Sequence, residues 1–198
     1  MPRKKLKHIQ QCFTLPNVIT EPSMLYNNSR DNITLEVGCG RGTYTLELGA
    51  LYPQQQFFGI DRKPDRIWAA ASSALEQNLS NASFIVSDVN QLGEFFPIQS
   101  ISAIWLPFPD PQPKVKYAQR RLIALNYLLL YKSLLKPQGK VHFKTDNTAL
   151  FIETQANIAS LHGSIHYVSK NFSDEINTTY EQHYRSLGQP IYYLCFSF

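Results

Sequence analysis

The amino-acid sequence predicts a doubly wound α/β fold built on a mostly parallel sheet. Short apolar runs alternate along the chain with longer segments of helical character. Strands buried on both faces have such runs, and helical crossovers connect them and cover the sheet. A glycine-rich turn directly after the first long apolar run is a further observation that favours this class, because such turns join strand to helix in doubly wound folds.

The expected elements follow from these runs. Strands are expected at residues 33–38, 57–61, 83–88, 101–108, 140–146 and 191–198. Helices are expected from the glycine-rich turn to about Leu51, from Pro64 or Asp65 to Asn78, across the basic segment after Pro113, and after residue 146. Residues 31–198 are expected to form one domain. Residues 1–30 read as a basic N-terminal extension, which is either a disordered tail or a segment that orders on RNA.

The composition indicates a single globular domain. A chain of 198 residues with 43% hydrophobic and 17% charged residues suits a single domain that buries roughly 70% of its unfolded surface. Cys12, Cys39 and Cys195 lie far apart and the five histidines show no ligand spacing, so neither a disulfide framework nor a metal site is expected. No apolar run is long enough for a signal peptide or a membrane span. We expect a soluble, cytoplasmic protein.

The basic residues are unevenly distributed. The formal net charge is +4, and four bases near the start equal this excess: Arg3, Lys4, Lys5 and Lys7. From Pro111 to Thr145 the chain has eight bases and no acid: Lys114, Lys116, Arg120, Arg121, Lys132, Lys136, Lys140 and Lys144. Such a stretch is either a surface for a polyphosphate partner, which it attracts by releasing counterions, or a solvated helix face.

The sequence LEVGCGRGTY places three glycines between a strand and a helix: Gly38, Gly40 and Gly42. Small residues at this point let the backbone approach a bound nucleoside. A dinucleotide-binding fingerprint would have its third glycine at position 43, which is Thr43, so this pattern disfavours a dehydrogenase.

Acidic residues stand at the ends of three successive predicted strands: Glu36, Asp61 and Asp88. The carboxyl ends of parallel strands converge on the crevice where open α/β sheets bind ligands. Asp61, 23 residues after Gly38, is placed to accept from two ribose hydroxyls, and Asp88 to meet an adenine amino group. Glu36 either holds the loop or reaches a methionine ammonium. Each acid alone could simply cap a helix. Together they favour S-adenosylmethionine, since acids repel phosphates and attract a sulfonium.

The segment PFPDPQPKVKYAQRRL frames one acid, Asp110, with four prolines and follows it with bases. Proline fixes its own φ and biases the preceding residue toward extended geometry, so Phe108, Asp110 and Gln112 are expected to be extended. The segment is either a proline-rich turn with a solvated acid or a site in which Asp110 is aimed by the backbone. Arg120 and Arg121 either hold phosphates or include one that satisfies a buried acid.

Four motifs in this order resemble the bacterial tRNA (guanine-N7-)-methyltransferases, which act on the variable-loop guanosine. They are EVGCGRG, FPDPQPK with the downstream RRL, HFKTDN, and TTYEQHYRSLGQPIY, and they cover the chain from about Ile33 onward. The resemblance implies a Rossmann-like methyltransferase fold with a mostly parallel seven-stranded sheet and a reversed last strand. It also implies S-adenosylmethionine as donor and tRNA as acceptor, with no metal, no membrane and no obligate protein partner.

The resemblance assigns roles residue by residue. It places Asp110 at the catalytic centre and assigns six residues to the cofactor: Glu36, Gly38, Gly40, Asp61, Asp88 and Asp110. It assigns six more to the substrate nucleotide and its surroundings: Lys114, Asp146, Thr178, Thr179, Tyr180 and Glu181. From the sequence alone, Asp146 could equally cap the following helix, and Thr178 with Glu181 could form a capping box in which Glu181 stays exposed.

The sequence departs from the family pattern at several positions. Gln112 stands where the family usually has Trp, and Val115, Lys116 and Tyr117 where it has Lys, Arg and His. Asp61 replaces what is often Glu. Two alternatives therefore stay open: a methyltransferase that acts on another nitrogen, of a nucleic acid or a small molecule, and an RNA-binding protein with a vestigial cofactor pocket.

Overall fold

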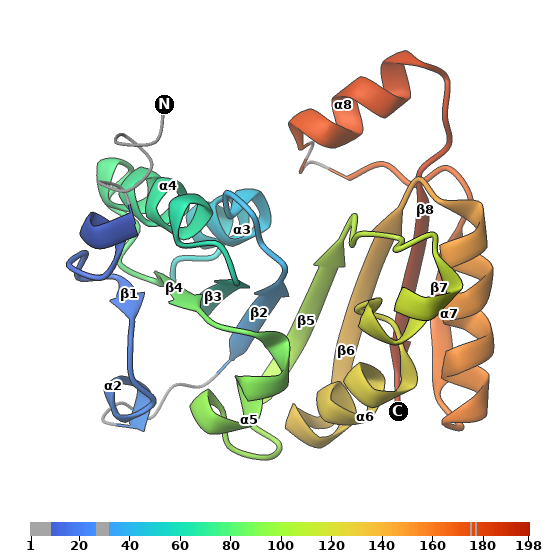
Figure 1. Ribbon diagram of the computed structural model, residues 1–198, viewed down its shortest axis with the longest axis horizontal. Helices are drawn as coiled ribbons and strands as arrows, with labels where there is room; N and C mark the ends of the chain where they lie inside the picture. Colours follow the sequence, from blue (N-terminus) through green and yellow to red (C-terminus); the bar gives the residue numbers. More distant parts are fainter. Residues whose placement is uncertain (1–8, 27–31, 175, 177) are drawn as a thin grey trace.

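The computed structural model describes residues 9–26, 32–174, 176 and 178–198, which form a mostly parallel sheet with helices on both sides (Figure 1). Within these residues the sheet has eight strands in the order β1-β4-β3-β2-β5-β6-β8-β7. The strands are β1 (Val18–Ile19), β2 (Ile33–Val37), β3 (Gln56–Asp61), β4 (Ala82–Val86), β5 (Ile101–Pro107), β6 (Leu135–Thr145), β7 (Ser164–Ser169) and β8 (Tyr192–Ser197).

The strand directions confirm the predicted sheet and its reversed last strand. Strands β1 to β6 pair in parallel, and β8 lies antiparallel to both β6 and β7. The sheet has one strand more than the expected seven, because β1 pairs with β4 at the edge through Val18 opposite Phe84. Neither β1 nor β7 was among the expected strand ranges.

The helices are α2 (Ser23–Tyr26), α3 (Thr43–Leu51), α4 (Pro64–Glu76), α5 (Leu92–Phe95), α6 (Leu125–Leu134), α7 (Thr148–Ser160) and α8 (Thr179–Ser186), with 3-10 turns η1 (Val89–Gln91) and η2 (Val115–Arg120). The expected continuous basic helix after Pro113 is wrong. Its bases lie first on η2, after which Arg121 is extended (ψ 133°) and interrupts the helical path before α6 begins. The other expected helices agree with α3, α4 and α7 within a few residues.

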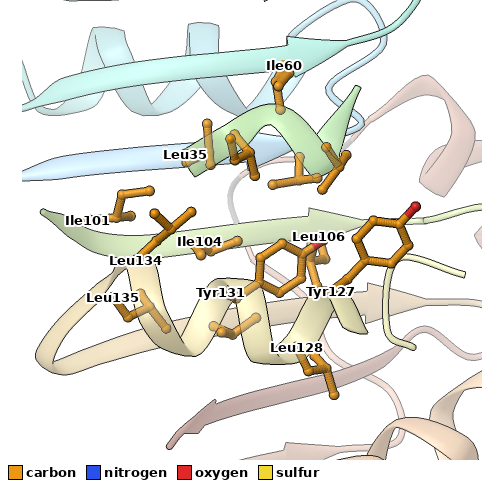
Figure 2. Packing of buried hydrophobic residues seen from close by; sticks show 14 of the residues in the cluster. Leu35, Ile60, Ile101, Ile104, Leu106, Tyr127, Leu128, Tyr131, Leu134 and Leu135 are labelled. Carbon is orange, nitrogen blue, oxygen red and sulfur yellow. The ribbon is translucent and has the colours of Figure 1, made fainter. Parts of the chain in front are cut away.

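Two hydrophobic clusters cover the two faces of the sheet. Successive side chains of a strand point to opposite faces, so neighbouring residues of β4 belong to different clusters. Phe84 packs with α4 in one cluster, and Ile85 packs in the other, which includes residues of α5, α6 and α7. Figure 2 shows the larger cluster, in which Tyr131 and Leu134 of α6 lie against Ile104 of β5. These apolar faces fix the strands, so the residues after each strand meet at the carboxyl edge of the sheet.

Part of the predicted N-terminal extension packs on the domain. Cys12 and Val18 are buried in the smaller cluster, and the Asn17 side-chain amide donates to the Ala71 carbonyl oxygen at 2.9 Å. The four bases from Arg3 to Lys7 lie outside the described residues. Within the described part of the chain, no helix has the length and apolar character required to cross a bilayer.

Candidate functional site

The glycine-rich turn after β2 needs glycine for two different reasons. Gly38, Gly40 and Gly42 all have left-handed φ angles, of 70°, 57° and 73°, which glycine adopts without steric cost. A Cβ at Gly42 would lie 2.7 Å from the Phe84 ring, so that glycine serves packing. A Cβ at Gly40 would meet nothing within 4 Å, so the backbone there borders open space, as the approach of a ligand requires.

Asp61 closes β3 directly beside this turn, as its position at the end of an apolar run predicted. Its Oδ2 accepts from the Gly40 backbone N–H at 3.1 Å, and its Oδ1 accepts from the Lys63 N–H at 2.9 Å. The Arg66 guanidinium lies 3.6 Å from Oδ2. Asp61 therefore ties the glycine turn to the start of α4 and brings a negative charge to the border of the open space.

Glu36 is buried beneath the turn, with 4% of its surface exposed. Its Oε2 accepts from both the backbone N–H and the hydroxyl of Thr45, at 2.8 and 2.7 Å. Of the two roles open from the sequence, these contacts support the one in which Glu36 holds the loop and the start of α3. Burial disfavours the ionised form and raises the pKa of Glu36 to about 7.

We expect Glu36→Gln to flatten the pH dependence of stability. Because the pKa of Glu36 is raised in the folded state, its stabilising contribution is present below about pH 4.5 and is lost as the pH rises through about 7. We expect urea denaturation to show that, between pH 5 and pH 8, the free energy of unfolding of wild type falls by on the order of 1 to 3 kcal/mol more than that of the variant. The exposed Glu47, changed to Gln, is the control. Equal pH slopes for wild type and Glu36→Gln would contradict the assignment.

Asp88 follows β4 and caps η1. Its Oδ1 accepts from the Asn90 backbone N–H at 3.0 Å and from the Asn90 side-chain amide at 2.7 Å, and Arg62 lies 3.7 Å from Oδ2. The capping role considered for this acid is thus present. Because β4, β3 and β2 are neighbours in the sheet, Asp88, Asp61 and Glu36 line one stretch of its carboxyl edge, as predicted.

The segment that carries Asp110 is a turn of unusual backbone geometry. Phe108 and Gln112 have φ angles of 51° and 42°, so the expectation of extended residues before Pro109 and Pro113 is wrong. Hydrogen bonds override the bias of proline: the Phe108 N–H donates to the Lys144 carbonyl oxygen at 2.8 Å, and the Gln112 N–H donates to Asp110 Oδ1 at 2.9 Å. Asp110 is exposed, and no described residue donates to its Oδ2.

The bases that follow the turn divide into two kinds. Lys114, Lys116 and Arg120 are exposed, and the last two lie over the Tyr117 ring, 5.1 and 4.6 Å from its centroid. Arg121 instead forms an ion pair with Glu153 of α7, so one of the two arginines does pair with an acid, although this acid is half-buried and not buried as expected. Leu122 places the segment beside the glycine turn, because a Cβ at Gly38 would lie 3.2 Å from Leu122 Cδ1.

Asp146, after β6, joins this edge through Tyr180. The Tyr180 hydroxyl lies 3.4 Å from both Asp146 carboxylate oxygens, and the Tyr180 ring centroid is 5.1 Å from that of Phe108. The alternative in which Asp146 caps α7 is wrong, because the cap is Asn147, whose Oδ1 accepts from the Leu150 N–H at 2.8 Å. Figure 1 shows α8 above the ends of β5 and β6.

The TTYE motif begins α8 as the capping pattern predicted, with one correction. Thr178 Oγ1 accepts from the Glu181 N–H at 3.0 Å, and Thr179 and Tyr180 are exposed. The expectation that Glu181 is an exposed acid is wrong: its exposed fraction is 0%. One carboxylate oxygen accepts from Lys144 Nζ at 2.7 Å and the other from the Arg185 guanidinium, so Glu181 anchors the helix from below.

Lys144 is a site residue that the sequence analysis assigned to the basic surface instead. Its exposed fraction is 0%, and its Nζ also donates to Asp174 Oδ1 at 3.0 Å. The ammonium lies between 5.3 and 5.9 Å from the ring centroids of Tyr44, Phe108 and Phe172. The available signal was a lysine directly after Phe143, near the carboxyl end of a strand, where a buried charge requires a partner.

His142 packs in the sheet. Its ring stacks on Trp105 with centroids 4.4 Å apart, and burial lowers the pKa of His142 to about 4. Among the described residues, no group of three or more His, Cys, Asp or Glu side chains is arranged to hold a metal ion.

Solved structures with the same fold are methyltransferases. One, titled "Structure of an antibiotic related Methyltransferase", matches with a TM-score of 0.66 at 17% identity, over 84% of this chain and 87% of that chain. A variant of the 16S rRNA (adenine(1408)-N(1))-methyltransferase from Catenulisporales acidiphilia, with cosubstrate SAM (S-adenosylmethionine), gives 0.64 at 14%, over 89% and 90%. The sheet order and the acid-lined glycine turn belong to the Rossmann-like fold of S-adenosylmethionine-dependent methyltransferases.

Sequence relatives narrow this class to one family. A family model described as "Putative methyltransferase" matches residues 30–194. The tRNA (guanine-N(7)-)-methyltransferase of Cytophaga hutchinsonii is 37% identical over 183 residues, 87% of this chain and 83% of the relative. That of Christiangramia forsetii is 38% identical over 176 residues, 83% and 77%. The chain belongs to the tRNA (guanine-N(7)-)-methyltransferase family.

Proposed function

We propose that this enzyme methylates N7 of the variable-loop guanosine of tRNA and that Asp110 positions the guanine. The observation that carries the proposal is the place of Asp110: an exposed carboxylate on a hydrogen-bonded turn after β5, the strand next to β2 and its glycine turn. The relatives at 37 and 38% identity are named for the same reaction on tRNA.

The residues around the glycine turn fit the cofactor. S-adenosylmethionine supplies a methyl group made electrophilic by its sulfonium. The carboxylates at the ends of β3 and β4 suit a cationic ligand that carries no phosphate. We assign Asp61 to the ribose hydroxyls and Asp88 to the adenine amino group. The backbone of Gly38 and Gly40 borders the cofactor, where any side chain would compete for space, and Glu36 supports the turn from beneath.

Guanine N7 has an in-plane lone pair and no proton, so the reaction is a direct displacement that needs no general base. Positioning is then the main contribution of the protein, and orientation alone can supply several kcal/mol of the barrier. A carboxylate can accept from guanine N1–H and the exocyclic amine together, which adenine cannot offer. Such a bidentate contact gives about 1–3 kcal/mol of discrimination, and the charge of Asp110 stabilises the cationic purine that forms.

The neighbouring residues would contact the rest of the nucleotide. Lys114, Asp146, Thr178, Thr179 and Tyr180 lie on the rim made by the β5 turn, the end of β6 and the start of α8. Lys116 and Arg120 would hold adjacent phosphates. Glu181 is assigned to the same substrate surface, but it acts from below, by fixing the helix that presents Thr179 and Tyr180.

Transfer of a labelled methyl group to a tRNA transcript tests the function directly. The control transcript has its variable-loop guanosine changed to adenosine. Label on the first transcript only is the expected result. Label on both would keep the methyltransferase and discard the site, whereas label on neither, with S-adenosylmethionine bound in calorimetry, would favour another acceptor or an RNA-binding role.

Replacing Lys114 and Lys116 with Gln is expected to weaken tRNA binding and to lower its salt dependence. Each phosphate contact adds about 0.7–0.9 to the slope of log K against log salt, so two lost contacts should reduce the slope by up to about two. The control replaces the exposed residues Lys132 of α6 and Lys140 of β6 with Gln, which removes the same amount of charge elsewhere on the surface. If both pairs change the slope equally, Lys114 and Lys116 do not contact phosphates specifically.

A further inference from the structure

The geometry points to Arg121 as a positioning residue, whose guanidinium holds the turn that carries Asp110 in its productive shape. This inference rests on the proposed role of Asp110. It assigns Arg121 a function different from that of the neighbouring exposed bases, and it makes α7 the rigid support of the guanine site.

Arg121 reaches three acceptors at once. Its Nε donates to the Pro111 carbonyl oxygen at 2.9 Å, and its Nη2 donates to the Gln112 carbonyl oxygen at 3.1 Å. Its Nη1 forms the ion pair with Glu153 of α7. The two carbonyl groups belong to the two residues directly after Asp110, so the guanidinium grips the backbone on the C-terminal side of the carboxylate.

The backbone that Arg121 grips is strained. Gln112 has φ 42° and precedes Pro113, a combination that costs on the order of 1–3 kcal/mol because it is left-handed and the residue is not glycine. Such a conformation persists only where the surroundings hold it. At Phe108, on the other side of Asp110, the hold comes from β6, through the Lys144 carbonyl oxygen. At Gln112 it comes from Arg121, which binds the Gln112 carbonyl oxygen, together with the hydrogen bond from the Gln112 N–H to Asp110 Oδ1.

This strained conformation aims the carboxylate. It turns the Gln112 N–H back onto Asp110 Oδ1 at 2.9 Å, which fixes one oxygen of the carboxylate and leaves Oδ2 open to a ligand. If Gln112 relaxed to the extended geometry that a following proline favours, this N–H would leave Oδ1. Asp110 would then lose its fixed orientation while remaining chemically intact.

An arginine suits this task better than a lysine. The planar guanidinium has five N–H donors in a fixed fork and can meet two carbonyl oxygens and a carboxylate together, whereas an ammonium is a point charge on a flexible stem. The support is firm, because a second contact ties the same segment to α7: the Asn157 side-chain amide donates to the Ile123 carbonyl oxygen at 2.9 Å. Residues 153 and 157 lie one turn apart on that helix.

The test separates the grip on the carbonyl groups from the ion pair. Arg121→Lys is expected to lower kcat for tRNA methylation about tenfold or more, with the Kd of S-adenosylmethionine unchanged. The charge-reversed pair Arg121→Glu with Glu153→Arg restores an ion pair but not the donors to Pro111 and Gln112. It should recover thermal stability and leave kcat low. Ile152→Ala changes an exposed side chain of the same helix, α7, and its kcat should stay within about twofold of wild type.

Recovery of kcat in the charge-reversed pair would overturn the inference, because Arg121 would then act only as an ion pair between the segment and α7. A second readout needs no activity: hydrogen exchange of the Gln112 amide, measured by NMR. Arg121→Lys should remove its protection even if the enzyme methylates a different acceptor. Unchanged protection would disprove the grip on the turn, whereas lost protection with no methylation of tRNA by wild type would reject only the proposed function.

Discussion

Asp110→Asn is expected to lower turnover on tRNA at least about tenfold, equivalent to about 1.4 kcal/mol of transition-state stabilisation. Asparagine keeps one oxygen, which can still accept from the Gln112 N–H, and has nearly the same size. It replaces the other oxygen with an NH2 group, which can only donate. This donor would face the N1–H and amino group of guanine, which are donors too, so no hydrogen bond could form between them. It also removes the negative charge opposite the cationic purine.

The matched measurements distinguish this loss from damage to the fold. Because Asp110 is exposed, the free energy of unfolding should change by less than about 0.5 kcal/mol. Binding of S-adenosylmethionine in calorimetry should be little changed. Asp110→Ala should lose at least as much activity, and in addition the acceptor for the Gln112 N–H. Near-normal turnover of the asparagine variant would remove Asp110 from the catalytic centre.

Lys144→Met should destabilise the protein by about 3–5 kcal/mol, the usual effect of removing one partner of a buried ion pair. Methionine keeps most of the unbranched stem and lacks only the terminal ammonium position, so the loss comes mainly from the missing charge and its hydrogen bonds. Glu181 would keep Arg185 on one oxygen but would lose its 2.7 Å contact on the other, and Asp174 would lose its 3.0 Å contact. The ammonium would also leave the three aromatic rings that surround it.

Urea denaturation measures this effect, and the chain offers a close control. Lys140 lies four residues earlier on the same strand and is exposed, so Lys140→Met should stay within about 0.5 kcal/mol of wild type. Adding Asp174→Asn to Lys144→Met should recover part of the loss, because it removes the carboxylate charge that has lost its ion pair with Lys144. If the two lysine variants were equally stable, the buried ion pair would contribute nothing.

The sequence predicted the parts of the fold that local pattern encodes. The apolar runs of β2 to β6 mark strands buried on both faces, and the acids near the ends of β2, β3 and β4 were placed at the correct edge. Strand β1 was missed because two residues are too few for a pattern. In β7, Ile165, Tyr167 and Val168 are exposed, so this edge strand carries no buried face to recognise.

The wrong predictions about Lys144, Phe108 and Gln112 have one cause, which is contact between residues that are far apart in the sequence. Lys144 pairs with Glu181, 37 positions away, and no local pattern distinguishes a lysine with such a partner from a solvated one. The proline rule correctly gives the intrinsic bias of Phe108 and Gln112, but the Lys144 carbonyl oxygen and Arg121 override it. In both cases tertiary contacts decide what the backbone preference alone cannot.

The order of the strands also has a consequence for the synthesis of the protein. Strand β8 lies between β6 and β7, although it is made after both, and within the described sheet β7 pairs with no other strand. During synthesis, β7 therefore has no strand to pair with until β8 has left the ribosome. Until then, the edge of β6 that will bind β8 is also unpaired. Helix α8, which carries Thr179 and Tyr180, is translated in the same interval. The rim that we propose for substrate binding would thus be assembled last, when β8 inserts and closes the sheet.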